Sequence, residues 1–258
     1  MSFGAVADDY DRLRPPPPGA AIDWLVPPGC RVAVDLAAGT GLLSRALAAA
    51  VPEVIAVEPD ERMADVLRAR SPGVRVMPGR GESIPLPDAS ADGVFISSAW
   101  HWLDPERAPA EIARVLRDGG RLGLIWTSRD RQVDWLQELD GARGRDRADR
   151  PAGEGEGEGE GEGDARTRGW RRDVAVPDGL FGNAEDQSFA FVRPMSKGDL
   201  VAMLGTYSGV ITASPHDRAA ALARAEAALD RRFPGVDRID VPMRTWCWRA
   251  DRVTRARA

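Results

Sequence analysis

A turn of small residues and an acid further along the chain have the types and spacing that could do chemistry. Asp35 to Gly41 reads Asp-Leu-Ala-Ala-Gly-Thr-Gly, between an apolar run and a helix-like stretch. Glycine leaves the backbone bare of side chains, so a ligand can approach it closely. Glu58 ends the next apolar run, at the distance expected for a carboxylate that binds ribose hydroxyls. Together these residues predict a nucleoside pocket.

The turn also admits interpretation as a dinucleotide site. The fingerprint Gly-x-Gly-x-x-Gly or Ala would here use Gly39, Gly41 and Ser44, so its last small residue is imperfect. A carboxylate at Asp35 would repel a pyrophosphate but suits a zwitterionic amino-acid tail. The acid therefore favours a ligand without phosphate, and an NAD(P)-dependent oxidoreductase stays open as an alternative.

The turn resembles the Asp-x-Gly-x-Gly-x-Gly signature of the S-adenosylmethionine-dependent methyltransferases of the Rossmann-like class. Ala37 stands where that signature has its first glycine, and alanine still leaves room for the methionine part of the ligand. The resemblance implies S-adenosylmethionine as cofactor, with Asp35 facing its amino-acid end and Glu58 binding its ribose. The family's cofactor-binding positions in this region are Asp35, Ala37, Gly39, Thr40, Gly41, Glu58, Pro59 and Met63.

A second segment beginning at Gly79 is similar to the family's Gly-x-Ala-Glu-x-Leu-Pro, whose small and acidic pair lies beside the adenine ring. Gly81 and Glu82 take those places, and we expect Glu82 to accept a hydrogen bond from the adenine amine. A surface carboxylate is the alternative. Ser98 follows the fourth predicted strand, at the end that borders the ligand crevice of an open sheet.

Trp100-His-Trp-Leu-Asp resembles a stretch of the subgroup that includes the trans-aconitate methyltransferases. The subgroup implies methyl transfer to a carboxylate or hydroxyl of a small molecule. His101 is the candidate catalytic residue, because an imidazole titrates near neutral pH and can act as a general base. Packing against Trp102 to hold the loop is the alternative. Phe3, Tyr10-Asp11 and Arg14-Pro15 match a family segment that folds over the bound cofactor.

The elements that position these residues alternate along the chain. We expect strands at about 31–36, 54–58, 74–77, 92–97, 121–126, 188–192 and 241–249, separated mostly by helices. This rhythm predicts an α/β fold, a doubly wound parallel sheet with helices on both faces. The family implies seven strands in the order 3-2-1-4-5-7-6 with an antiparallel far edge. Asp60 and Asp104 predict helix starts, and Gly119-Gly120 predicts the end of the second of these helices. Later helices are expected at about 198–207 and 215–232.

Four segments follow from this pattern. We expect an N-terminal arm and cap over 1–29, a cofactor-binding core over 30–139, a flexible Gly/Glu-rich insertion over 140–177, and a completion of the sheet with a helical substrate cover over 178–258. Glycine and glutamate alternate from Gly153 to Glu162, which cannot pack a core and predicts a solvated linker. Alternatively, the tract is the docking element of a non-catalytic S-adenosylmethionine-binding regulatory module.

Composition narrows the class further. The 258 residues carry a formal charge of −5, which argues against nucleic acid as a partner. Cys30 and Cys247 show no metal-type spacing, so two free buried thiols in a reducing compartment and no metal are expected. No run approaches the roughly 20 apolar residues of a membrane span, and no signal core is seen. We therefore expect a cytoplasmic enzyme acting on a small molecule.

Overall fold

The computed structural model describes residues 7–142, 174 and 176–253, and these divide into two compact units. The core unit, as we call it, comprises 7–128, 176–191 and 244–253. The helical unit comprises 129–142, 174 and 192–243. Phe3 and the Gly-Glu tract at 153–162 lie outside the described residues.

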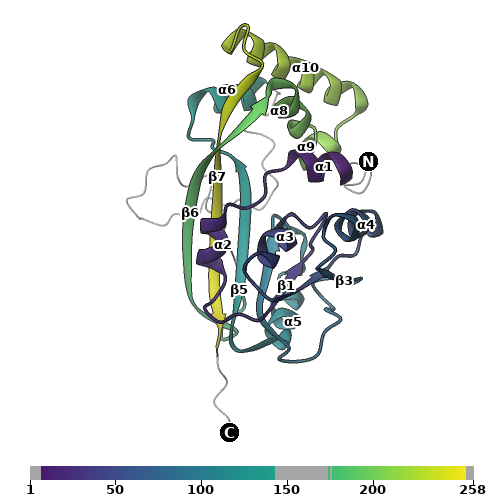
Figure 1. Ribbon diagram of the computed structural model, residues 1–258, viewed down its shortest axis with the longest axis vertical. Coiled ribbons are helices and arrows are strands. Elements are labelled where there is room, and N and C mark those ends of the chain that lie inside the picture. Colours follow the sequence, from purple (N-terminus) through teal and green to yellow (C-terminus); the bar gives the residue numbers. More distant parts are fainter. Residues whose placement is uncertain (1–6, 143–173, 175, 254–258) are drawn as a thin grey trace. The chain divides into compact units, whose positions relative to one another are not determined.

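The core unit contains the strands that carry the predicted site (Figure 1). They are β1 (Val32–Leu36), β2 (Glu53–Val57), β3 (Arg75–Met77), β4 (Ala91–Ser97) and, up to residue 128, β5 (Leu116–Arg129). Its helical elements are α1 (Ala7–Leu13), α2 (Gly19–Leu25), α3 (Leu42–Ala48), α4 (Glu61–Arg70), the 3₁₀ turn η2 (Trp100–Trp102) and α5 (Arg107–Val115). Parts of β6 (Phe181–Ser196) and β7 (Arg238–Arg252) complete the unit.

The sheet has seven strands in the order β3-β2-β1-β4-β5-β7-β6. The pairs from β3 to β5 are all parallel. The contacts of β7 with β5 run in opposite directions along the two strands, since Arg121 pairs with Asp251 while Thr127 bonds Thr245. The predicted fold class, strand order and antiparallel edge are confirmed.

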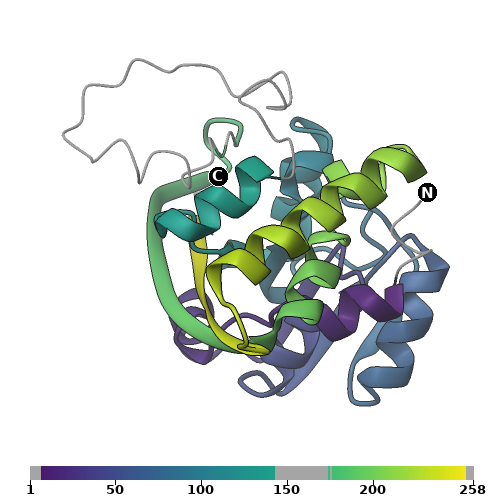
Figure 2. The same ribbon diagram turned by 90° about the horizontal axis from the view of Figure 1, so that it is seen from above.

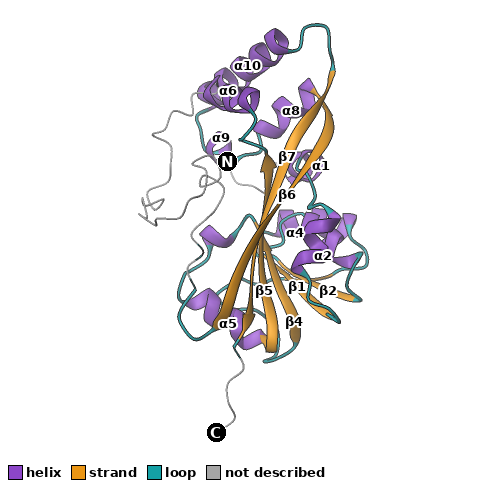
Figure 3. Ribbon diagram, turned by 90° about the vertical axis from the view of Figure 1, so that its left-hand side faces the viewer, coloured by secondary structure: helices purple, strands orange, loops and turns teal. Residues whose placement is uncertain are grey.

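Helices cover both faces of the parallel strands. Figure 3 shows α2 and α4 on one face and α5 on the other. Ala108, Ile112 and Val115 of α5 are fully buried, at the spacing that places them on one helical stripe. Cys30 and Cys247 are free thiols, as predicted, and belong to the buried cluster formed by residues of α2, α3 and the sheet. Burial raises the pKa of both thiols, that of Cys30 to about 11.

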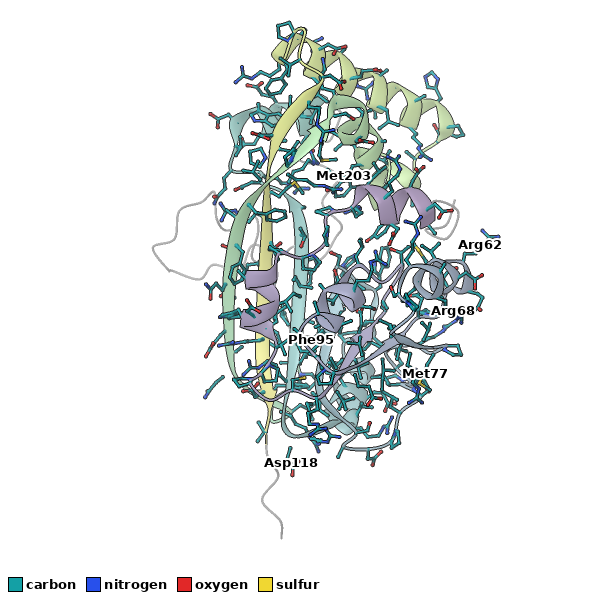
Figure 4. The ribbon with its side chains drawn as sticks, viewed as in Figure 1. Arg62, Arg68, Met77, Phe95, Asp118 and Met203 are labelled. Carbon is teal, nitrogen blue, oxygen red and sulfur yellow. The ribbon has the colours of Figure 1, made fainter. Side chains whose placement is uncertain are left out.

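Phe95 fills the centre of the sheet and requires two glycines around it (Figure 4). A Cβ at Gly93, two residues earlier on β4, would lie 2.6 Å from the ring. A Cβ at Gly123, the residue on β5 that pairs with Phe95, would also lie 2.6 Å from the ring. These glycines therefore make space for an aromatic side chain between close-packed layers.

The prediction that Gly119-Gly120 ends a helix is wrong. Helix α5 ends at Val115, and β5 begins at the next residue. Leu116 pairs with Ala91, and the register then shifts before Arg121 pairs with Gly93. Gly119 has φ of +73°, so it serves an irregularity of the ladder that favours glycine. The predicted cap at Asp60 is confirmed, because its side chain accepts from the N–H of Arg62 at the start of α4. The helix start predicted at Asp104 is early: α5 begins at Arg107 with Glu106 as its N-cap, and Asp104 accepts the N–H of Arg107 from the turn before the helix.

The helical unit contains α6 (Asp134–Ala142), α8 (Lys197–Leu204), α9 (Ser208–Ile211) and α10 (Pro215–Arg232). Figure 2 shows α6 beside α10, where the rings of Trp135 and Phe233 meet edge to face with centroids 5.2 Å apart. The predicted helix at 215–232 is confirmed, whereas the one at 198–207 is shorter and a separate turn follows it. Both late strands extend beyond their apolar runs.

Candidate functional site

The turn between β1 and α3 takes a left-handed backbone at three positions. Ala37, Gly39 and Gly41 have φ of +55°, +57° and +84°. This conformation suits glycine and costs other residues roughly 1–2 kcal/mol. Ala37 therefore adopts a strained backbone conformation at the position where the family signature has glycine.

The two glycines of the turn serve different purposes. A Cβ at Gly41 would lie 2.7 Å from Cγ of Leu67 on α4, so Gly41 allows α3 and α4 to pack. A Cβ at Gly39 would meet nothing within 4 Å. The backbone at Gly39 therefore faces open space, which is where a ligand could lie against it.

The turn is held from both sides by charged side chains. Glu58, only 6% exposed, accepts the N–H of Gly39 at Oε2 (2.7 Å) and the N–H of Asp60 at Oε1 (2.9 Å). On the other side, Nη1 of Arg45 donates to the carbonyl of Thr40 at 3.0 Å. Burial raises the pKa of Glu58, and its two backbone hydrogen bonds oppose that shift.

Asp35 is a buried acid at the end of β1, and part of its hydrogen-bonding capacity is unused. Its Oδ2 accepts from the Ser44 hydroxyl at 2.5 Å. Its Oδ1 is buried without a hydrogen-bond partner among the described residues, and so is Oγ1 of Thr40. Burial, with a contribution from the nearby Glu58, raises the pKa of Asp35 to about 7. Such an acceptor is costly unless a donor reaches it.

Gly81 and Glu82 lie in a short loop that packs on the loop after η2. A Cβ at Gly81 would come within 2.8 Å of Leu103, so close packing requires glycine there. Glu82 uses Oε1 to accept the N–H of Asp104 at 2.9 Å. This bond gives Glu82 a structural role, and its binding of adenine stays a prediction.

His101 and Ser98 lie past the carboxyl end of β4. Ser98 has φ of +56°, and its N–H donates to the carbonyl of Ile125 at 2.9 Å. His101 is exposed, and its ring packs on Trp102 with centroids 4.9 Å apart. Trp102 is itself 64% exposed. The contact between the two rings agrees with a role in holding the loop, and a role as base stays a prediction.

The remaining predicted residues lie on α4, directly before α4, and on α1. Met63 is buried in α4 and Pro59 is exposed just before that helix. Tyr10 is half-buried on α1, with the Arg14 guanidinium 5.0 Å from its ring centroid.

Comparisons with known proteins agree on one family. A family model described as a methyltransferase domain matches residues 34–124. A methyltransferase-like protein of Schizosaccharomyces pombe is 31% identical over 212 residues, which is 80% of this chain and 77% of that protein. The chain belongs to the S-adenosylmethionine-dependent methyltransferases.

Other methyltransferases share large parts of the chain. An uncharacterized methyltransferase of Mycobacterium tuberculosis is 49% identical over 146 residues, and the match spans 57% of this chain and 60% of that protein. A malonyl-[acyl-carrier protein] O-methyltransferase of Methylococcus capsulatus is 40% identical over 136 residues, 48% of this chain and 49% of that enzyme. The structure of a candidate type II methyltransferase from Anaeromyxobacter dehalogenans has a TM-score of 0.71 at 27% identity, covering 94% of this chain and 99% of that one.

The residues of this methyltransferase fit the family's cofactor, S-adenosylmethionine. The partnerless oxygen of Asp35 suits the ammonium of an amino acid, which can donate to it. The bare backbone at Gly39 and the adjacent carboxylate of Glu58 suit a nucleoside.

Among the described residues, no group of three or more His, Cys, Asp or Glu could hold a metal ion, and no helix is long and apolar enough to cross a membrane.

Two side chains of the site were not among the predicted residues. The sequence pattern gives Ser44 only as the imperfect third position of a dinucleotide fingerprint, whereas in the structure its hydroxyl donates to Asp35. Arg45 belongs to none of the sequence motifs, yet its guanidinium donates to the Thr40 carbonyl of the turn. The available signal was a hydroxyl and a guanidinium within the first turns of the helix that follows the glycines.

Proposed function

We propose that this protein transfers the methyl group of S-adenosylmethionine to a carboxylate or hydroxyl oxygen of a small molecule. The observation that supports it most is the hydrogen bond between Glu58 and the Gly39 N–H, beside the partnerless buried oxygen of Asp35. In this arrangement Glu58, as an acid for the ribose, and Asp35, as an acceptor for the ammonium, lie at the same glycine turn.

The chain's own residues have the task of binding and orientation. When bound, S-adenosylmethionine supplies an activated methyl group on a sulfonium. Asp35 would accept from the ammonium, Glu58 from the ribose hydroxyls, and Gly39 would offer bare backbone. Alignment of the acceptor oxygen at roughly 3–3.5 Å from the methyl carbon lowers the activation barrier of methyl transfer by several kcal/mol, and no covalent intermediate with the protein is needed.

The acceptor oxygen is proposed on two grounds. The stretch Trp100-His-Trp-Leu-Asp resembles the trans-aconitate methyltransferase subgroup, to which we assign the chain. The Methylococcus relative is named as an O-methyltransferase. A carboxylate acceptor is ionised at neutral pH and needs no base, whereas a hydroxyl requires one, for which His101 is the candidate.

The formal charge of −5 supports a small molecule and not a nucleic acid as acceptor. Two free buried thiols support a reducing compartment such as the cytoplasm.

The test combines calorimetry with product analysis. We expect S-adenosylhomocysteine to bind the wild-type protein and Glu58→Ala to bind it at least about tenfold more weakly. With labelled S-adenosylmethionine and a panel of small carboxylic acids and alcohols, mass spectrometry should find an acceptor that gains the label. Binding of NADH in place of S-adenosylhomocysteine would overturn the proposal. Cofactor binding without any methylated product from the panel and from a metabolite extract would favour the regulatory module.

A further inference from the structure

One guanidinium group joins the glycine turn to the first described helix of the chain. Arg45 uses Nη1 to donate to the Thr40 carbonyl at 3.0 Å and to the Ser71 hydroxyl at 3.3 Å. It uses Nη2 to donate to Oδ1 of Asp11 at 2.5 Å. Because the group is planar and rigid, a shift of α1 that moves Asp11 also moves the donor that holds the turn.

The Asp11 end of this link is buried and strongly paired. Its side chain is 5% exposed, and that of Arg45 is 30% exposed. Arg70 of α4 approaches the second oxygen of Asp11 at 3.6 Å. Removal of Arg45 would leave the buried Asp11 carboxylate with only the longer contact to Arg70 among the described residues, so the docking of α1 depends mainly on Arg45.

The Thr40 end of the link lies at the ligand-facing part of the turn. Thr40 stands between Gly39, whose N–H donates to Glu58, and Gly41, the N-cap of α3. The peptide groups of the turn are therefore oriented by Glu58 on one side and by Arg45 on the other. A ligand that binds against Gly39 would meet the peptide groups of the turn in this orientation.

We propose that Arg45 is a positioning residue that couples the docking of α1, through Asp11, to the binding of the cofactor at the glycine turn. Such coupling is reciprocal: the cofactor strengthens the docking of α1, and the docked α1 strengthens cofactor binding. The inference concerns the cofactor alone, so it goes beyond the proposed methyl transfer and does not depend on the identity of the acceptor.

A double-mutant cycle tests the coupling in the full chain. The variants are Arg45→Gln, Asp11→Asn and the double variant, and the titrant is S-adenosylhomocysteine in a calorimeter. We expect each single variant to raise Kd about tenfold and the double variant to raise it little further, because both changes break one link. Arg68→Gln is the matched control, an arginine of α4 paired with Glu61 and Asp65, and its Kd should stay within about twofold of the wild-type value.

A merely structural role for Arg45 would change stability alone, so a second readout follows α1 directly. Hydrogen exchange of the amides in Ala7–Leu13 should slow when S-adenosylhomocysteine binds the wild type, and this protection should be lost in Arg45→Gln. Arg45→Lys, which keeps the charge but cannot serve all partners with one planar group, should restore part of the affinity. It also provides a folded variant if Arg45→Gln does not fold.

Additive effects in the cycle, unchanged affinity in Asp11→Asn, or protection of α1 retained in Arg45→Gln would each overturn the proposal. If the wild type fails to bind S-adenosylhomocysteine, both the cofactor assignment and this inference fall. If it binds but no acceptor is found, only the proposed methyl transfer fails.

Discussion

The hydroxyl of Ser44, in the first turn of the helix that follows the glycine turn, donates to Oδ2 of Asp35 at 2.5 Å. The bond stabilises the ionised carboxylate and so lowers its pKa, but burial raises that pKa more, to about 7. Near neutral pH this acid is therefore divided between its protonated and ionised forms. Two predictions depend on that balance.

The first concerns stability. The pKa of Asp35 is 3.8 in the unfolded chain and about 7 in the folded protein, so the folded state binds more protons between these values. The free energy of unfolding should therefore fall as pH rises from about 4 to about 7, by up to about 1.4 kcal/mol per pH unit. Burial of Glu58 contributes in the same direction. Urea unfolding measured across this range should show a weaker pH dependence in Asp35→Asn, and an equal dependence in both proteins would contradict the assignment.

The second concerns the cofactor. An ammonium bound to Asp35 favours the ionised acid, so the affinity for S-adenosylhomocysteine should rise with pH up to about 7, by at most roughly tenfold per unit. Ser44→Ala removes the side-chain hydrogen bond that lowers the pKa of Asp35, while the smaller lowering effects of the Ser44 backbone and of Arg45 remain. Its affinity profile should therefore move to higher pH when measured by calorimetry. A profile that stays in place would show that Ser44 does not set the ionisation of Asp35.

The glycines of the turn should separate binding from stability. Gly39→Ala adds a methyl into open space at a left-handed residue, so it should cost about 1–2 kcal/mol of stability and weaken S-adenosylhomocysteine binding at least about tenfold. Gly41→Ala adds the same strain and a contact of 2.7 Å with Leu67. It should cost more stability, about 3 kcal/mol or above. Unfolding and binding measured on the pair should show opposite rankings, and identical rankings would contradict the division of roles.

Glu58→Gln should harm both folding and binding. Both carboxylate oxygens accept backbone N–H groups, and an amide cannot accept at its nitrogen. One N–H then loses its partner inside the protein, at a cost of about 1–3 kcal/mol. Glu53→Gln, an exposed acid at the start of β2, is the control and should change stability by less than about 0.5 kcal/mol. Equal effects of the two substitutions in urea unfolding would argue against the role of Glu58.

His101→Ala should distinguish the two proposed acceptor types once an acceptor is in hand. With a carboxylate acceptor, kcat should stay within about twofold of the wild-type value, because no proton has to leave. With a hydroxyl acceptor, kcat should fall about 10²-fold or more. Steady-state kinetics at saturating acceptor decide between them, and His101→Gln keeps a side chain against Trp102 as a control for the loop.

The local pattern was sufficient to predict the strands of the parallel sheet, the cap of α4 and the glycine turn before α3. These features depend on a few consecutive residues, whose apolar period, hydroxyl or carboxylate caps and glycines act within one helical turn. The strand order and antiparallel edge came from the resemblance to the methyltransferases, and the structure confirmed them. The prediction that a helix ends at Gly119 was wrong because glycine occurs at strand irregularities as well as at helix ends, and pairing with the neighbouring strand decides between them.

Only the tertiary structure decided which contacts the site residues make within the protein. It showed that Gly39 faces open space while Gly41 faces Leu67, although the two glycines look alike in sequence. It also placed Arg45 against Asp11, 34 residues away. The burial of a side chain, an acceptor oxygen left without a donor and a long-range hydrogen bond all depend on which distant segments pack together. The local sequence around a residue does not determine that packing.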